Sequence, residues 1–221
     1  DGSMYTGAGA MCGASPPNVA KPTGQWRDIF ESIYWGPGLD GKQWLGVLGN
    51  HDYGGWKFTA AWDQAIGYTW AHPPVSSSRW VTPAQFWSAK VWYSNFAVDY
   101  YFVDTNFVDA HSMLSDPLHN LCSLEHNGAE ASCQDTGPTS VSNCSEWFSR
   151  LWSEQLLWLE KELPKSTATW QVVVTHFPPS YAQKSWAPLS AKYGIDLFVV
   201  GHVHKQELHP AEGEDSAWIL S

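Results

Sequence analysis

Asparagine and histidine side chains follow three short apolar runs of the sequence. Asn50 and His51 come after the run 45–48, His176 after the run 170–175, and His202 and His204 after the run 195–200. Neutral imidazole nitrogens and amide oxygens are ligands for borderline and harder divalent metals, and thiolates are absent from this set. The residue types therefore predict a metal site built from nitrogen and oxygen ligands.

Two neighbouring ions held by such ligands are suited to the hydrolysis of phosphate esters. One ion activates a water molecule, while both stabilise charge on the phosphoryl oxygens. His202 and His204 are separated by one residue, so on an extended strand they would share a face. On a turn they could instead point to two neighbouring ions. The sequence leaves both arrangements open.

Strands and amphipathic helices alternate along the chain, which is typical of an α/β fold. Apolar residues at helical spacing predict helices over 24–34 and 153–163, with a shorter helix over 187–194. Runs rich in β-forming residues predict strands over 43–49, 96–105, 170–175, 195–200 and 216–221. Because the carboxyl ends of strands in an open α/β sheet are where sites gather, this fold would bring the three polar groups together.

A chain of 221 residues, 43% of them hydrophobic, is long enough to bury one sizeable core. We expect residues 1–221 to form a single domain that is part of a longer protein and incomplete at both ends. The segments 71–94 and 116–145 are predicted to be irregular, the second being a Cys-bearing loop insertion. The aromatic residues of the first segment are expected to pack a second core layer.

The charge of the chain argues against one class of partner. Asp and Glu number 22 against 12 Lys and Arg, a formal net charge of -10. A nucleic-acid-binding face is normally basic, so we expect none here. No apolar run approaches the roughly 20 residues that a bilayer requires, so we expect no membrane span in this region.

The cysteines indicate a secretory route. Cys122, Cys133 and Cys144 lie in one polar stretch, and none shows the close pairing of a zinc site. We expect one or two disulfides that pin this loop. Asn143 opens an Asn-Cys-Ser glycosylation sequon in the same stretch. An extracellular, vacuolar or lysosomal glycoprotein is therefore predicted.

The sequence resembles a known family in these same motifs. GNHD at 49–52, VVTH at 173–176 and GHVH at 201–204 match, in order, the latter half of the calcineurin-like metallophosphoesterase signature. Within that superfamily the chain is most similar to the tartrate-resistant purple acid phosphatases, through stretches such as VDYYFVDTN and YGIDLFVVGHVH. The resemblance implies a four-layer α/β/β/α sandwich of two mixed sheets flanked by helices.

The resemblance also implies ligands for two ions, Fe(III) and a divalent Fe, Zn or Mn. The divalent ion would be bound by Asn50, His176 and His202. His204 would bind the ferric ion, together with Tyr5 as a further ligand and Asp1 as the bridge between the metals. The last two belong to DGSMY at 1–5, where they stand one residue further apart than in the family motif.

Two family elements have no counterpart in this sequence. The first metal-binding Asp would lie upstream, so we expect the chain to be a fragment that lacks this motif. The second substrate-contacting His is absent from the segment 178–188, where Lys184 could supply positive charge instead. Asp52 is assigned no metal by the family motif, so we expect it to support the turn.

The expected activity is that of an acid phosphatase acting on small phosphomonoesters or phosphoproteins. A metal-bound hydroxide would attack phosphorus, Asn50 and His51 would contact the phosphate, and His51 would protonate the leaving alkoxide as general acid. One alternative is a phosphodiesterase or nucleotide hydrolase with a manganese or zinc pair. A second alternative, motivated by the missing Asp and His, is a degenerate domain without catalytic activity.

Overall fold

The computed structural model describes Cys12 and residues 25–59, 62–71, 73–74, 76–211 and 216–220. Two sheets form in these residues. The larger has the strand order β3-β4-β5-β6-β8-β7, and the smaller pairs β1 with β2. The strands are β1 (Trp44–Leu45), β2 (Trp80–Val81), β3 (Trp87–Trp92), β4 (Ala97–Val103), β5 (Trp170–Thr175), β6 (Leu197–Val200), β7 (Glu207–His209) and β8 (Ala217–Leu220).

The large sheet is mixed, as predicted. Its central strands β4, β5, β6 and β8 run parallel, whereas β3 and β7 pair antiparallel at the two edges. Val173 and Phe198, which face each other in the β5–β6 register, are both fully buried. Such burial is expected of the central strands of a parallel sheet, which are covered on both faces.

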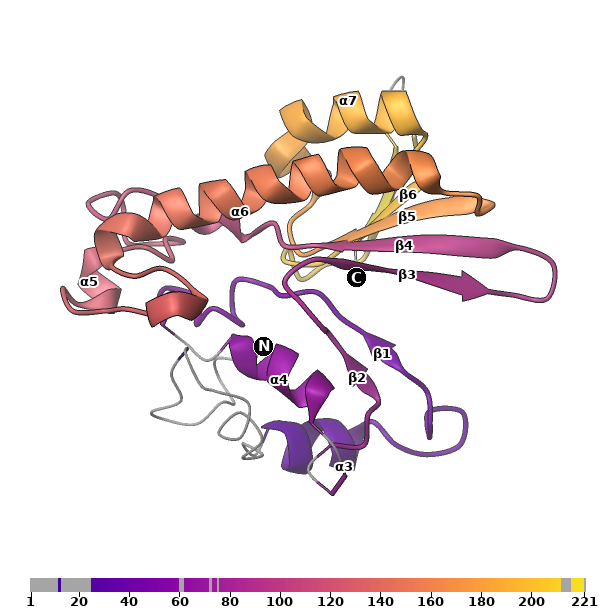
Figure 1. Cartoon of the computed structure of the whole chain (residues 1–221), viewed down its shortest axis with the longest axis horizontal. Helices are drawn as coiled ribbons and strands as arrows, with labels where there is room; N and C mark the ends of the chain where they lie inside the picture. The colour runs from indigo at the N-terminus through magenta and orange to yellow at the C-terminus, as the bar shows by residue number, and fades with distance from the viewer. Residues whose placement is uncertain are drawn as a thin grey trace.

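Helices cover the outer faces of the two sheets (Figure 1). The long helix α6 (Val141–Glu162) and α7 (Gln183–Tyr193) lie on one side of the large sheet. The small sheet lies on the other side, followed by α4 (Asp63–Trp70) and α3 (Glu31–Ile33). The expected α/β architecture of mixed sheets flanked by helices is therefore confirmed. The shorter helical elements are η1 (Gln25–Phe30), η2 (Asn106–Asp109), α5 (Leu124–Asn127), η3 (Gln134–Thr136), η4 (Leu163–Lys165) and η5 (Pro179–Ala182).

The helix predicted at 153–163 is longer than expected. It begins at Val141, and the Ser140 hydroxyl caps it by accepting a hydrogen bond from the backbone N–H of Asn143. The Ser- and Asn-rich first turns are poor helix formers. Buried Cys144 and Phe148 hold them against the core, so tertiary packing overrides propensity.

The segment 71–94 is not irregular throughout. It contains β2 and β3. Some of its indole rings pack against other aromatic side chains, as predicted, and one does not. Trp80 lies 5.0 Å from Trp26 between ring centroids, and Trp87 stacks on Phe102 at 4.0 Å. Trp92, at the end of the β3–β4 hairpin, is exposed. The predicted strand 43–49 was too long, because only Trp44 and Leu45 pair with a neighbour.

Two disulfides join the polar segment to the rest of the fold. Cys122 pairs with Cys144 and so ties the segment to the first turn of α6. Cys133 pairs with Cys12, across 121 residues of sequence. The expectation of one or two disulfides is confirmed, and the partner of Cys133 is Cys12, which lies outside the polar stretch that holds the other three cysteines. Two disulfides are typical of proteins that fold in an oxidising compartment.

Candidate metal centre

Three of the predicted ligands meet after their strands: His176 directly follows β5, His202 follows β6, and Asn50 lies in the turn after β1. The Oδ1 atom of Asn50 lies 2.8 Å from Nε2 of His176. Nδ1 of His202 lies 3.2 Å from the same Nε2 atom. Each of these atoms can present a lone pair. A neutral imidazole ring carries a single N–H proton, on one of its two nitrogens. The cluster therefore gathers more electron-pair donors than it has hydrogens to share among them.

The chain around Asn50 is shaped to let His176 approach. A Cβ atom on Gly49 would lie only 2.7 Å from Nδ1 of His176, so glycine leaves the space that the imidazole ring occupies. The Asp52 carboxylate accepts a hydrogen bond of 2.8 Å from the backbone N–H of Gly49. Asp52 thus supports the turn, as expected, and Gly55 closes it by donating to the Asn50 carbonyl.

His202 and His204 lie in a bend between β6 and β7 and not on an extended strand. Their φ angles are 74° and 56°, in the left-handed region that non-glycine residues rarely adopt. Of the two arrangements left open by the sequence, the structure shows the turn. His202 packs on Phe177, with 4.3 Å between ring centroids, whereas His204 is exposed. Strained backbone of this kind is frequent at functional sites.

The imidazoles of the cluster are held in the neutral form. Burial, reinforced by the neighbouring His202, lowers the pKa of His176 to about 3. Burial also lowers the pKa of His202 and of His51. A neutral imidazole keeps the lone pair that metal binding requires.

The sequence did not single out Asp109, which holds the other end of the Asn50 amide. Its Oδ2 atom accepts a hydrogen bond of 3.0 Å from Nδ2 of Asn50, and both residues are buried. Burial raises the pKa of Asp109, and the Asn50 hydrogen bond partly offsets that rise. The sequence offered one signal for this part of the site. Strand β4, like β5 and β6, is followed by polar residues, Asp104 to Asn106, and Asp109 comes three residues later.

That polar run is hydrogen-bonded to the two segments that carry Asn50 and His176. Nδ2 of Asn106 donates to the Leu48 carbonyl at 3.0 Å, just ahead of Asn50. The Thr105 hydroxyl accepts from the backbone N–H of Phe177 at 3.1 Å, just after His176. The end of β4 therefore fixes both segments that carry the ligands.

The remaining predicted site residues are not members of this cluster, and two of them fall outside the described residues. His51 is half-buried beside Gly55. Lys184 is exposed in the first turn of α7, and within the described residues no hydrogen bond or ion pair joins it to the histidines. Asn143 lies in the first turn of α6, and its amide oxygen accepts from Thr139. Asp1 and Tyr5 fall outside the described residues.

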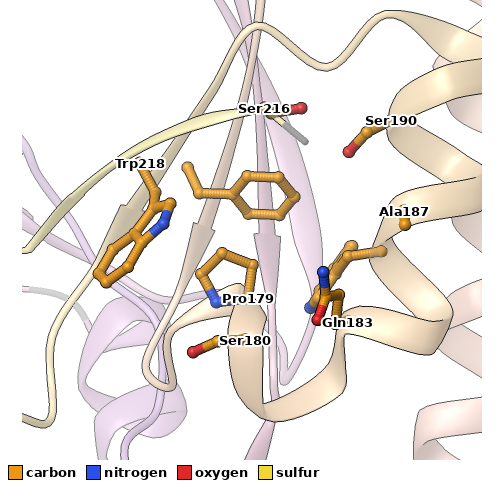
Figure 2. Close-up of a pocket in the computed structure, with 9 residues that line it drawn as sticks. Pro179, Ser180, Gln183, Ala187, Ser190, Ser216 and Trp218 are labelled. Carbon is orange, nitrogen blue, oxygen red and sulfur yellow. The ribbon is translucent and has the colours of Figure 1, made fainter. Parts of the chain in front are cut away.

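A separate hollow of about 100 Å³ lies between α7 and the strands β6 and β8. Figure 2 shows Ala187 and Ser190 on the helix, opposite Ser216 and Trp218. Among the described residues that line it there is neither a histidine nor a cationic side chain. A phosphate ester would find no charge complement there, so we place the candidate site at the histidine cluster.

Comparison with known families agrees with this geometry. A family model for calcineurin-like phosphoesterases matches residues 15–206, a range that includes every member of the cluster. The chain belongs to this family. Calcineurin-like phosphoesterases generally hydrolyse phosphate esters and typically bind two metal ions. No curated protein sequence matches the chain.

Among solved structures, the chain is similar to one described as GAP50, the anchor in the inner membrane complex of Plasmodium. The TM-score is 0.57 at 17% identity, over 90% of this chain and 55% of that one. At this identity the likeness shows the fold alone. The chain spans about half the length of that structure.

The donor types of the cluster suit one divalent metal ion. Ligand atoms about 2.1 Å from a tetrahedral ion lie about 3.4 Å from one another, similar to the spacing between the two imidazole nitrogens. Within the described residues no group of three or more His, Cys, Asp or Glu is arranged to hold a metal. The third donor of the cluster is the Asn50 amide oxygen. For a second ion, His204 is the predicted ligand that the described chain supplies.

Proposed function

We propose that the chain is a metal-dependent phosphoric monoester hydrolase of the acid phosphatase type. The convergence of Asn50 and His202 on Nε2 of His176, at 2.8 Å and 3.2 Å, supports this function most directly. All three donors are neutral, so a bound ion keeps its full positive charge for an anionic substrate. Within the family, the sequence is most similar to the purple acid phosphatases, and this similarity favours monoesters over diesters as substrates.

Each residue of the site has a role in this proposal. Asn50, His176 and His202 hold the divalent ion, while His204, with Asp1 and Tyr5, holds the ferric ion. The bound ions supply Lewis acidity that polarises the phosphoryl oxygens and activates water. The substrate is a small phosphomonoester or phosphoprotein, and Lys184 remains a predicted phosphate contact. The two disulfides support a secretory, extracellular or vacuolar setting.

His51 acts as the general acid in this scheme, in its protonated form. Burial lowers its pKa, and the negative charge of a bound phosphate would act in the opposite direction. His51 follows Asn50 directly and is half-buried beside the cluster, so it can face a phosphate held there. As the P–O bond to the leaving group breaks, the His51 proton passes to the alkoxide oxygen, and a neutral alcohol departs. The negative charge that would develop on the leaving oxygen is thereby removed.

The histidine ligands provide the first test of the proposed function. We expect the purified full-length protein to hydrolyse nitrophenyl phosphate and to contain metal. The double variant His202→Ala, His204→Ala should lose nearly all activity and most of its metal, measured by elemental analysis. His126→Ala, on α5, is the matched histidine control and should keep both. Full activity in the double variant would contradict the proposal.

The role of His51 can be tested through the leaving group. Nitrophenolate leaves with little help from an acid, whereas an alkoxide needs a proton. We expect His51→Ala to reduce hydrolysis of an alkyl phosphate by roughly 10²–10⁴-fold, the usual contribution of a general acid. Hydrolysis of nitrophenyl phosphate should fall much less. Equal losses on both substrates would show that His51 only binds phosphate.

A non-catalytic metallophosphoesterase domain is the second candidate. The three converging donors could serve one ion, and the fourth predicted ligand, His204, is exposed in the described structure. The same purified protein separates the two candidates. Metal near zero per chain together with no phosphatase activity would support the non-catalytic domain, whereas two metals per chain with activity would support the hydrolase.

A further inference from the structure

Asp109 holds the amide group of Asn50 in one orientation. An asparagine amide has a donor end, the NH₂ group, and an acceptor end, the carbonyl oxygen. The Asp109 carboxylate accepts from Nδ2 of Asn50 at 3.0 Å, which leaves Oδ1 directed at Nε2 of His176 at 2.8 Å. A half-turn of the amide would place the NH₂ group at the cluster, and an NH₂ group cannot bind a cation.

We propose that Asp109 is a positioning residue that keeps the Asn50 oxygen directed at the metal position. This inference rests on the proposed function, because it concerns the same site. Within the described residues Asp109 is hydrogen-bonded to Asn50 and to neither histidine of the cluster, so it acts through Asn50. Hydrogen bonds of this kind, which a metal ligand donates to a supporting carboxylate, typically contribute 10- to 100-fold to metal affinity.

The fold holds Asp109 in place for this role. The residue ends η2, the short helical turn that follows β4, and its carbonyl accepts from the backbone N–H of Leu121 at 2.7 Å. Its side chain is 6% exposed, so water does not compete effectively for its oxygens. Asn106, at the other end of the same turn, is bound to the Leu48 carbonyl. The segment that carries the Asp109 carboxylate is therefore hydrogen-bonded to the segment that carries the Asn50 amide.

A purely structural alternative makes a different prediction. If Asp109 only satisfied a buried NH₂ group, its loss would reduce stability without a specific effect on ion affinity. Two variants separate the roles. Asp109→Leu has a similar branched shape, though it is larger, and has no acceptor, whereas Asp109→Asn keeps an oxygen in the same place without the charge.

The first measurement is the affinity of the metal-free, full-length protein for Zn²⁺, by equilibrium dialysis. We expect Asp109→Leu to bind Zn²⁺ about 10- to 100-fold more weakly than the wild type, and Asp109→Asn to recover most of the affinity. Asp135→Leu, at an exposed position, is the matched control and should bind as the wild type does. Wild-type affinity in Asp109→Leu would overturn the inference.

The second measurement needs no metal and separates failure of the inference from failure of the proposed function. In nuclear magnetic resonance spectra of the metal-free protein, the Asn50 side-chain NH₂ protons should exchange slowly with water. Exchange should become fast in Asp109→Leu and remain slow in Asp109→Asn. If the wild type bound no Zn²⁺ but showed this pattern, the proposed function would fail and the positioning role would stand. Unchanged exchange in Asp109→Leu would overturn the positioning role. If Asp109→Leu does not fold, fast Asn50 exchange together with wild-type Zn²⁺ affinity in Asp109→Asn would likewise overturn it.

Discussion

Gly49 illustrates how the absence of a side chain shapes the candidate centre. The His176 ring lies where a Cβ atom on residue 49 would be, at 2.7 Å from Nδ1 and 2.9 Å from Cε1. Contacts this short force one partner to move. At this position, therefore, the glycine is needed for the approach of an imidazole to the backbone rather than for an unusual φ angle.

We predict that Gly49→Ala displaces His176 and weakens Zn²⁺ binding by at least the 10-fold expected of a disturbed ligand. The variant should also lose about 1–3 kcal/mol of unfolding free energy, as overpacked sites do. Gly46→Ala is the matched control, because its Cβ would lie 2.7 Å from the Thr82 hydroxyl, away from the cluster. We expect it to lose stability alone. Equal Zn²⁺ affinities in both variants would refute this account of Gly49.

At the scale of elements, the end of β4 connects the site to the helical layer. Asp104, 1% exposed, accepts hydrogen bonds from the Tyr53 hydroxyl at 2.7 Å and from Asn106. Its backbone N–H and carbonyl both bond to the side chain of Gln155 on α6. Burial raises the pKa of Asp104 from 3.8 to about 6, despite these hydrogen bonds. Tyr53 and Asp52 are the titratable groups that act on it.

A pH dependence of stability follows from this raised pKa. Between pH 4 and 6 the folded chain binds more protons at Asp104 than the unfolded chain, so stability falls as pH rises through this window. A shift of this size corresponds to up to about 3 kcal/mol. In Asp104→Asn this contribution should be absent. Urea unfolding at pH 4, 5, 6 and 7 checks it, and parallel curves for the wild type and the variant would exclude it.

At the scale of the whole molecule, two sheets and two helical layers place the carboxyl ends of β4, β5 and β6 at one edge. Described residues distant in sequence, such as Asn50 and His176, meet there. Two disulfides fasten the polar segment before α6 to this frame. No helix among the described residues is long and apolar enough to span a bilayer.

Much of this arrangement could be predicted from local patterns. Strands β4, β5 and β6 were recognisable because their apolar runs are short and bounded by polar residues. The start of α6 was missed because Ser140 to Ser149 lacks strong helix formers and is held by the disulfide and by Phe148. Strands β2 and β3 were missed because indole rings obscure the alternation that marks a strand.

The sequence by itself determined the α/β class and the chemical identity of the donors, because both depend on residue type and on order along the chain. Only the tertiary structure decided that Cys12 pairs with Cys133, that His202 and His204 lie in a turn, and that Asp109 holds Asn50. Each of these depends on the local path of the backbone or on contacts between residues far apart in sequence. Asp109 and Asn50 are 59 residues apart, and no local pattern records that they touch.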